Sequence, residues 1–140
     1  MDITSLFGQL SLSSGDYIKS QSSFTDYYEG YGFFGVLSSV TTAEMYAVKL
    51  SSAATMRVHG TPTTLPKSIT LNTGWTWLPC PYQAAVDLSV GAPVFSYSGG
   101  DQFKSQSTFS DYYDGFGWFG TLNTLQPGHG YKVKVATGGS

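Results

Sequence analysis

Residues 15–37 read GDYIKSQSSFTDYYEGYGFFGVL, and residues 100–122 read GDQFKSQSTFSDYYDGFGWFGTL. Fifteen of these 23 positions are identical without a gap, at a constant offset of 85 residues. Most of the differences keep the character of the side chain, as in Phe33 against Trp118. The chain is therefore internally duplicated, and internal repeats usually form stacked or symmetry-related units.

The same offset continues more weakly on both sides of the duplicated stretch. We therefore interpret residues 1–140 as a single domain of two repeats, with a first unit at 2–55 and a second unit at 87–140. The segment 56–86 supplies connecting strands, among them Gly-Trp-Thr-Trp-Leu-Pro at 74–79. This strand leads into the second unit only, so we expect the first unit to lack a leading strand.

Local patterns in each unit are typical of strands. Polar and apolar residues alternate at 17–21 and 131–135, and no stretch keeps helical periodicity over three turns. Glycine beside an acidic residue predicts tight turns, with two-residue hairpin loops and positive φ at Gly30 and Gly115. The predicted turn residues are Gly15, Asp16, Gly30, Gly100, Asp101 and Gly115. The fold class is therefore all-β: two antiparallel meanders, related by a pseudo-twofold axis, in one sandwich or barrel.

Composition limits the classes of partner. Hydrophobic residues make up 41% of the chain but charged residues only 11%, with a net charge of −2. The chain has no basic stripe for nucleic acid and no run of about 20 apolar residues for a membrane span. Low charge also weakens repulsion between copies, so self-association is favoured. Cys80 is the only cysteine, and the role of a buried small apolar residue is preferred to that of a reactive or intermolecular thiol.

Eight of the nine acidic residues occupy matching positions in the two units. Paired carboxylates suit an acid and base for hydrolysis, with Asp111 and Asp114 as the candidates, or oxygen ligands for calcium. Because most of them adjoin turn glycines, we favour turn and ion-pair roles, the latter for Asp26 and Asp111 with nearby lysines. We expect no catalytic residue, no resident metal and no cofactor.

The aromatic clusters are the remaining candidates for a binding surface. Alternate residues of a strand face opposite sides, so half of each cluster can pack in the core while the other half faces outward. Outward tyrosine and tryptophan rings can stack on sugars or on a partner protein. The candidate ligand or interface residues are Tyr27, Tyr28, Tyr31, Tyr112, Tyr113, Trp118, Trp75 and Trp77.

Two motifs resemble a known kind of repeat. The GWTWLPxP strand and the GDxxKSQSxFxDYYxGxGxFGxL core resemble a β-repeat module of multi-repeat proteins from marine microalgae and some bacteria. The chain is more loosely similar to the pyrenoid shell proteins of algae, which carry two related β-rich regions and assemble into sheets. The resemblance implies a scaffold or surface role without chemistry.

Two functions remain from this reading. The first is a structural module that associates with itself into a coat, sheet or filament, extracellular or at the cell surface, or else in an organellar protein shell. The alternative is a carbohydrate-binding module that uses exposed Tyr and Trp rings on a polysaccharide. For self-association we expect an open sheet edge near residues 2–20, which charge placed at Leu10 or Leu12 would block.

Overall fold

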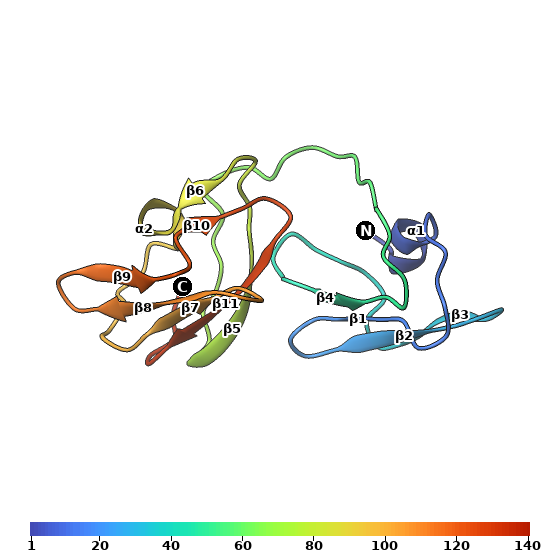
Figure 1. The fold of residues 1–140 in the computed structure, drawn as a ribbon, viewed down its shortest axis with the longest axis horizontal. Helices are drawn as coiled ribbons and strands as arrows, with labels where there is room; N and C mark the ends of the chain where they lie inside the picture. The colour runs from blue at the N-terminus through green and yellow to red at the C-terminus, as the bar shows by residue number, and fades with distance from the viewer. The chain divides into compact units, whose positions relative to one another are not determined.

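The computed structural model describes all 140 residues, 1–140, as two compact units, Met1–Thr61 and Pro62–Ser140. We call them unit 1 and unit 2 (Figure 1). The fold is all-β with antiparallel sheets, and each unit has a hydrophobic core of its own.

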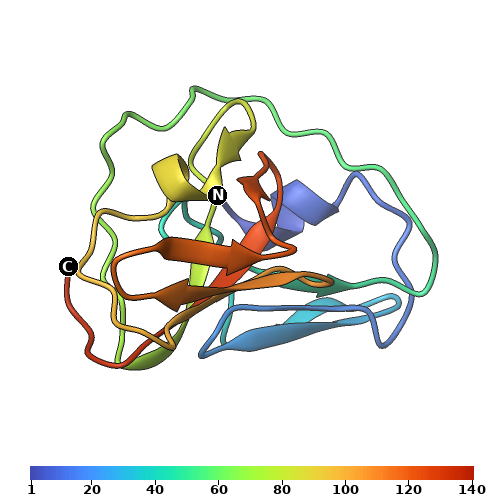
Figure 2. The ribbon, with the colours of Figure 1, turned by 60° about the vertical axis from the view of Figure 1, so that its left-hand side comes forward.

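Unit 1 is a four-stranded sheet with one short helix, α1 (Ile3–Phe7), lying over one face (Figures 1 and 2). Its buried core consists of Ile3, Phe7, Ile18 and Leu37. Alternation along each strand turns one row of side chains toward α1 and the other toward solvent. The strands in sheet order are β3 (Gly32–Gly35), β2 (Phe24–Tyr28), β1 (Tyr17–Lys19) and β4 (Ala47–Lys49).

Unit 2 has a five-stranded sheet covered on one face by α2 (Leu88–Gly91) and by a short ladder of β6 (Val86–Asp87) with β10 (Thr124–Leu125) (Figure 2). Its core is larger and includes the fully buried Phe103 and Val133. The sheet order is β5 (Gly74–Pro79), β11 (Gly130–Val135), β7 (Gln102–Lys104), β8 (Phe109–Tyr113) and β9 (Gly117–Gly120).

The 85-residue offset holds in three dimensions. Strands β1, β2, β3 and β4 occupy the same places in their sheet as β7, β8, β9 and β11. Even the isolated bridge of Asp2 with Ser39 has its equivalent in the pair of Asp87 with Thr124. The one strand of the unit 2 sheet without an equivalent in the unit 1 sheet is β5.

The connecting segment differs from the expected arrangement. Its strand β5 pairs along its whole length with β11 and so belongs to unit 2. Alternation along β5 turns Thr76 and Leu78 inward, where both are buried, and turns the candidate interface residues Trp75 and Trp77 to the other side. The two tryptophans therefore lie on the outer face of the sheet.

The predicted open edge was also placed wrongly. Strand β1 lies between β2 and β4, and residues before it form α1, so 2–20 is not a sheet edge. Leu10 and Leu12 pack against the core of unit 1, and a charge there would disturb that core rather than an interface. The strand that ends the unit 1 sheet on this side is β4.

The hairpin glycines take the left-handed conformation, with φ of +81° at Gly30 and +78° at Gly115. The loops are longer than the expected two residues, because Tyr28 pairs with Gly32 and leaves three residues between them. At Gly35 the constraint is different: an added Cβ would meet Phe24 O and lie 2.6 Å from Thr25 Cα. The hairpins therefore need glycine both for backbone conformation and for close packing.

We predict that Gly30→Val and Gly115→Val each lower the free energy of unfolding by about 1–3 kcal/mol, because a β-branched residue is strained at positive φ. Gly60→Val is the control, since an added Cβ at Gly60 meets nothing within 4 Å and its φ is not positive. Chemical denaturation followed by circular dichroism measures the difference. Equal stability of the Gly30→Val and Gly60→Val variants would contradict the prediction.

Candidate functional site

In each unit, the side chain of a buried aspartate links the turn before the first strand of the repeat to the backbone that follows β4 or β11. In unit 1, Asp16 accepts hydrogen bonds from Ser13 N at 2.9 Å, from Ser51 N at 2.8 Å and from Ser51 Oγ at 2.6 Å. The Ser51 hydroxyl, with the backbone donors, holds the pKa of Asp16 below its ordinary value. We call this arrangement the carboxylate clamp.

Unit 2 repeats the carboxylate clamp one offset later. Asp101 accepts from Ser98 N at 2.9 Å and from Ala136 N at 3.0 Å. Ala136 stands where unit 1 has Ser51, so the second clamp has one donor fewer. Both aspartates are 4% exposed. Asp16 and Asp101 were predicted as turn residues, and their side chains also reach across 35 residues of chain.

Three of the other carboxylates also have structural partners. Asp2 caps α1 through Ser5 N, Asp114 accepts from Gly99 N at 2.9 Å, and Asp111 accepts from Gln102 Nε2 at 2.9 Å. Lys104, which we expected to pair with Asp111, places its Nζ over the Trp75 ring. No three or more His, Cys, Asp and Glu side chains are grouped so that they could hold a metal ion.

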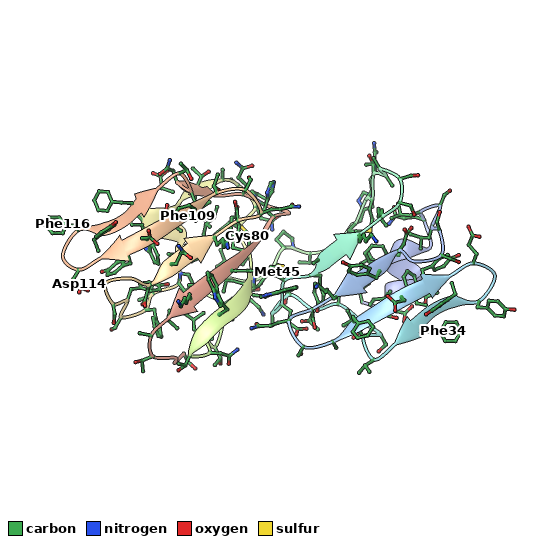
Figure 3. The ribbon with its side chains drawn as sticks, turned by 60° about the horizontal axis from the view of Figure 1, so that its bottom comes forward. Phe34, Met45, Cys80, Phe109, Asp114 and Phe116 are labelled. Atoms are coloured by element: carbon green, nitrogen blue, oxygen red, sulfur yellow. The ribbon has the colours of Figure 1, made fainter.

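The outer face of each β-hairpin carries a cluster of exposed rings. We call Phe24, Tyr28, Tyr31 and Phe34 the aromatic face of unit 1, and Phe109, Tyr113, Phe116 and Phe119 the aromatic face of unit 2. Every one of these rings is between 48% and 82% exposed. Figure 3 shows Phe34 and Phe116 pointing away from their hairpins.

The two aromatic faces have the same internal geometry. Tyr28 and Phe34 meet edge to face with ring centroids 5.8 Å apart, and Tyr113 and Phe119 do so at 5.7 Å. These are favourable separations for aromatic pairs. Each aromatic face therefore contains one ring pair with the same edge-to-face arrangement.

Strand alternation divides the predicted aromatic candidates between the two faces. Tyr28, Tyr31 and Tyr113 lie on the aromatic faces. Tyr27, Tyr112 and Trp118 instead point to the core side and are half-buried, Trp118 lying 4.9 Å from the Tyr97 ring and 5.6 Å from the Phe103 ring. Burial raises the pKa of Tyr97, whose hydroxyl donates to Pro93 O.

Five phenylalanines of the aromatic faces were not among the predicted candidates: Phe24, Phe34, Phe109, Phe116 and Phe119. A signal was present in the sequence, because Phe24 and Tyr28 are four residues apart and so share one side of a strand. The exposure of these phenylalanines could not be predicted, because the alternation does not say which side of the strand faces the core.

Lysines flank the tryptophans on the outer face of unit 2. Lys132 Nζ lies 4.8 Å from the centroid of Trp77, and Lys104 Nζ lies 5.6 Å from that of Trp75. Such cation–π contacts leave both rings half-buried. Trp75 and Trp77 thus lie on the same side of the sheet as the aromatic face of unit 2, separated from it by β11 and β7, and differ from it in exposure.

One shallow pocket lies on the aromatic face of unit 2, lined by Tyr113, Phe116 and Phe119. Its lining is almost wholly ring surface, which suits stacking on an apolar or sugar face rather than chemistry. Cys80 lies elsewhere, packed against the core of unit 2, and burial raises the pKa of its thiol. A raised pKa lowers the fraction of thiolate, so Cys80 is a poor nucleophile at neutral pH.

Comparison with known proteins gives no relative. No protein-family model, no curated protein and no solved structure matches the chain. Neither α1 nor α2 has the length and hydropathy to span a membrane.

We predict that Asp16→Asn destabilises unit 1 at pH 7, and that the deficit shrinks in acid. The lowered folded-state pKa makes the carboxylate stabilising above its ordinary pKa of 3.8, and this contribution is lost as the pH falls through the folded-state value. Urea denaturation between pH 7 and pH 2 measures it. Asp87→Asn is the control, because Asp87 makes no side-chain capping bond. A deficit that is constant across this pH range would contradict the assignment.

Proposed function

We propose that the chain is a non-catalytic structural module whose copies associate through the two aromatic faces. The observation that carries this proposal is the way in which the two units have diverged. Phe24, Tyr28 and Phe34 are exposed, yet unit 2 keeps the identical residues at 109, 113 and 119. An exposed ring that is retained while its surroundings change points to binding.

Some positions in or beside the cores have changed between the units, whereas three of the four rings in each aromatic face are identical. Ile18 is replaced by Phe103, Phe33 by Trp118 and Leu12 by Tyr97. In a module that only had to fold, the core would be retained and exposed phenylalanines would be lost, because exposed apolar rings contribute little to stability. The retention of these exposed rings supports a partner for the aromatic faces.

The duplication makes each chain bivalent. A chain with two adhesive surfaces can contact two neighbours, and contacts that do not close into a ring extend into a filament or sheet. The 11% content of charged residues leaves little electrostatic repulsion to oppose this. A coat, sheet or filament is therefore the assembly that we propose, at the cell surface, outside the cell or in an organellar shell.

We predict that the mass of the particles rises with protein concentration, and that the double variant Tyr31→Ser/Phe116→Ser stays monomeric. Truncation of such central rings typically costs about 2 kcal/mol or more, which weakens each contact roughly 30-fold. Light scattering coupled to size-exclusion chromatography measures the mass. Either single variant should form smaller particles than the unmodified chain, because one of its two faces remains.

The matched control is Val58→Ser/Val94→Ser, which removes one exposed apolar residue from each unit outside the aromatic faces. It should assemble like the unmodified chain. A strictly monomeric chain at millimolar concentration, or equal assembly by the double variant and the control, would refute the proposal.

A carbohydrate-binding module is the second candidate, favoured by the shallow pocket of Tyr113, Phe116 and Phe119. Because the pocket lies on unit 2, carbohydrate binding predicts that substitutions in the two aromatic faces have different effects. Titration with soluble polysaccharides should then show saturable binding that Phe116→Ser removes and Tyr31→Ser leaves intact. Binding that neither substitution alters, or no binding, would exclude this role for the pocket.

A further inference from the structure

Strand β4 of unit 1 and strand β11 of unit 2 are equivalent, but their surroundings differ. β11 lies between β7 and β5, whereas β4 pairs with β1 and ends its sheet. The missing neighbour of β4 changes the exposure of one pair of equivalent, identical residues. Val133 on β11 is 0% exposed, and Val48 on β4 is 47% exposed. The backbone edge and the inward row of β4 are thus left uncovered within unit 1.

Neighbouring positions show the same difference. Tyr131 and Val135 are buried in unit 2, and their equivalents Tyr46 and Leu50 are only half-buried. In unit 2 the row is closed by β5, which places Leu78 opposite Tyr131 and Thr76 opposite Val133. Strand β5 of unit 2 therefore indicates which kind of strand fits against the uncovered side chains of β4 in unit 1.

We propose that the β4 edge of unit 1 is an acceptor for a separate extended strand of the β5 type, bound antiparallel to β4. The occupant has the pattern Gly-aromatic-Thr-aromatic-Leu, with Leu opposite Tyr46 and Thr opposite Val48. Exposed edges of this kind bind strands through main-chain hydrogen bonds, and alternate side chains supply specificity. This interaction uses a surface distinct from the aromatic faces and does not depend on them.

The outer face of the acceptor favours the aromatic residues of such a strand. In unit 2, Trp75 lies opposite Lys134 and beneath Lys104, and unit 1 has Lys49 and Lys19 at these two positions. Trp77 lies beneath Lys132, which unit 1 replaces with Ala47. Unit 1 therefore has both lysines of the first aromatic site, with Lys49 Nζ 5.7 Å from the centroid of Tyr17, and lacks the lysine over the second.

The probe is a synthetic peptide of residues 68–79, SITLNTGWTWLP, added to the full chain that carries Tyr31→Ser/Phe116→Ser, so that association through the aromatic faces does not interfere. We expect saturable binding by fluorescence anisotropy of the labelled peptide. At tenfold excess over the dissociation constant, exchange of the newly paired amides within 46–50 should slow by about tenfold.

Three matched changes test the geometry. Val48→Lys in the chain, or Leu78→Asp in the peptide, should weaken binding at least about tenfold, and the second leaves the folded chain untouched. Ala47→Lys should strengthen binding, because it restores the lysine over the second aromatic ring. Val58→Lys, an exposed position away from the edge, should leave binding unchanged.

Other occupants of the β4 edge would give different results in the exchange and binding measurements. Slower exchange at 46–50 that rises with the concentration of the chain alone would assign the edge to a second copy and overturn the proposal. Absence of binding, slowing confined to unit 2, or equal binding of the Leu78→Asp peptide would overturn it as well.

Discussion

The buried carboxylates Asp16 and Asp101 are the constraint on which both sheets depend. Each joins the turn that enters the sheet to the backbone that leaves β4 or β11, two segments 35 residues apart. A charge that is 4% exposed would be costly without partners, and here backbone N–H groups supply them. Between these ends, Gly35 and Gly120 let β3 and β9 approach β2 and β8 closely, because an added Cβ at either glycine would collide with the neighbouring strand.

Much of this architecture could be predicted from the sequence, because repeats, strand alternation and glycine turns are local signals. The helices could not be predicted: α1 and α2 contain five and four residues, too few to show a helical period. The orientation of Trp75 and Trp77 could not be predicted for another reason. Large aromatic residues usually contribute to cores, and only the partner strand β11 reveals that Thr76 and Leu78 face inward.

The candidate surfaces were partly predictable for the same reasons. Sequence alternation shows that Tyr28 and Tyr27 point to opposite sides but does not say which of them is exposed. The exposure of Val48 had no local signal at all, because Val133 has the same identity and is buried. That difference arises from a non-local pairing, and it can be found only by comparing two units that share a fold and differ in one strand.

The distribution of tryptophan gives the two units different optical properties. Trp75, Trp77 and Trp118 all belong to unit 2, whereas the rings of unit 1 are those of tyrosine and phenylalanine only. Excitation at the red edge of the absorption band therefore reports on unit 2 alone, and its emission is silent about unit 1. A single intact chain thus contains its own spectroscopic label, with which the unfolding of the five-stranded sheet can be followed separately from that of its four-stranded counterpart.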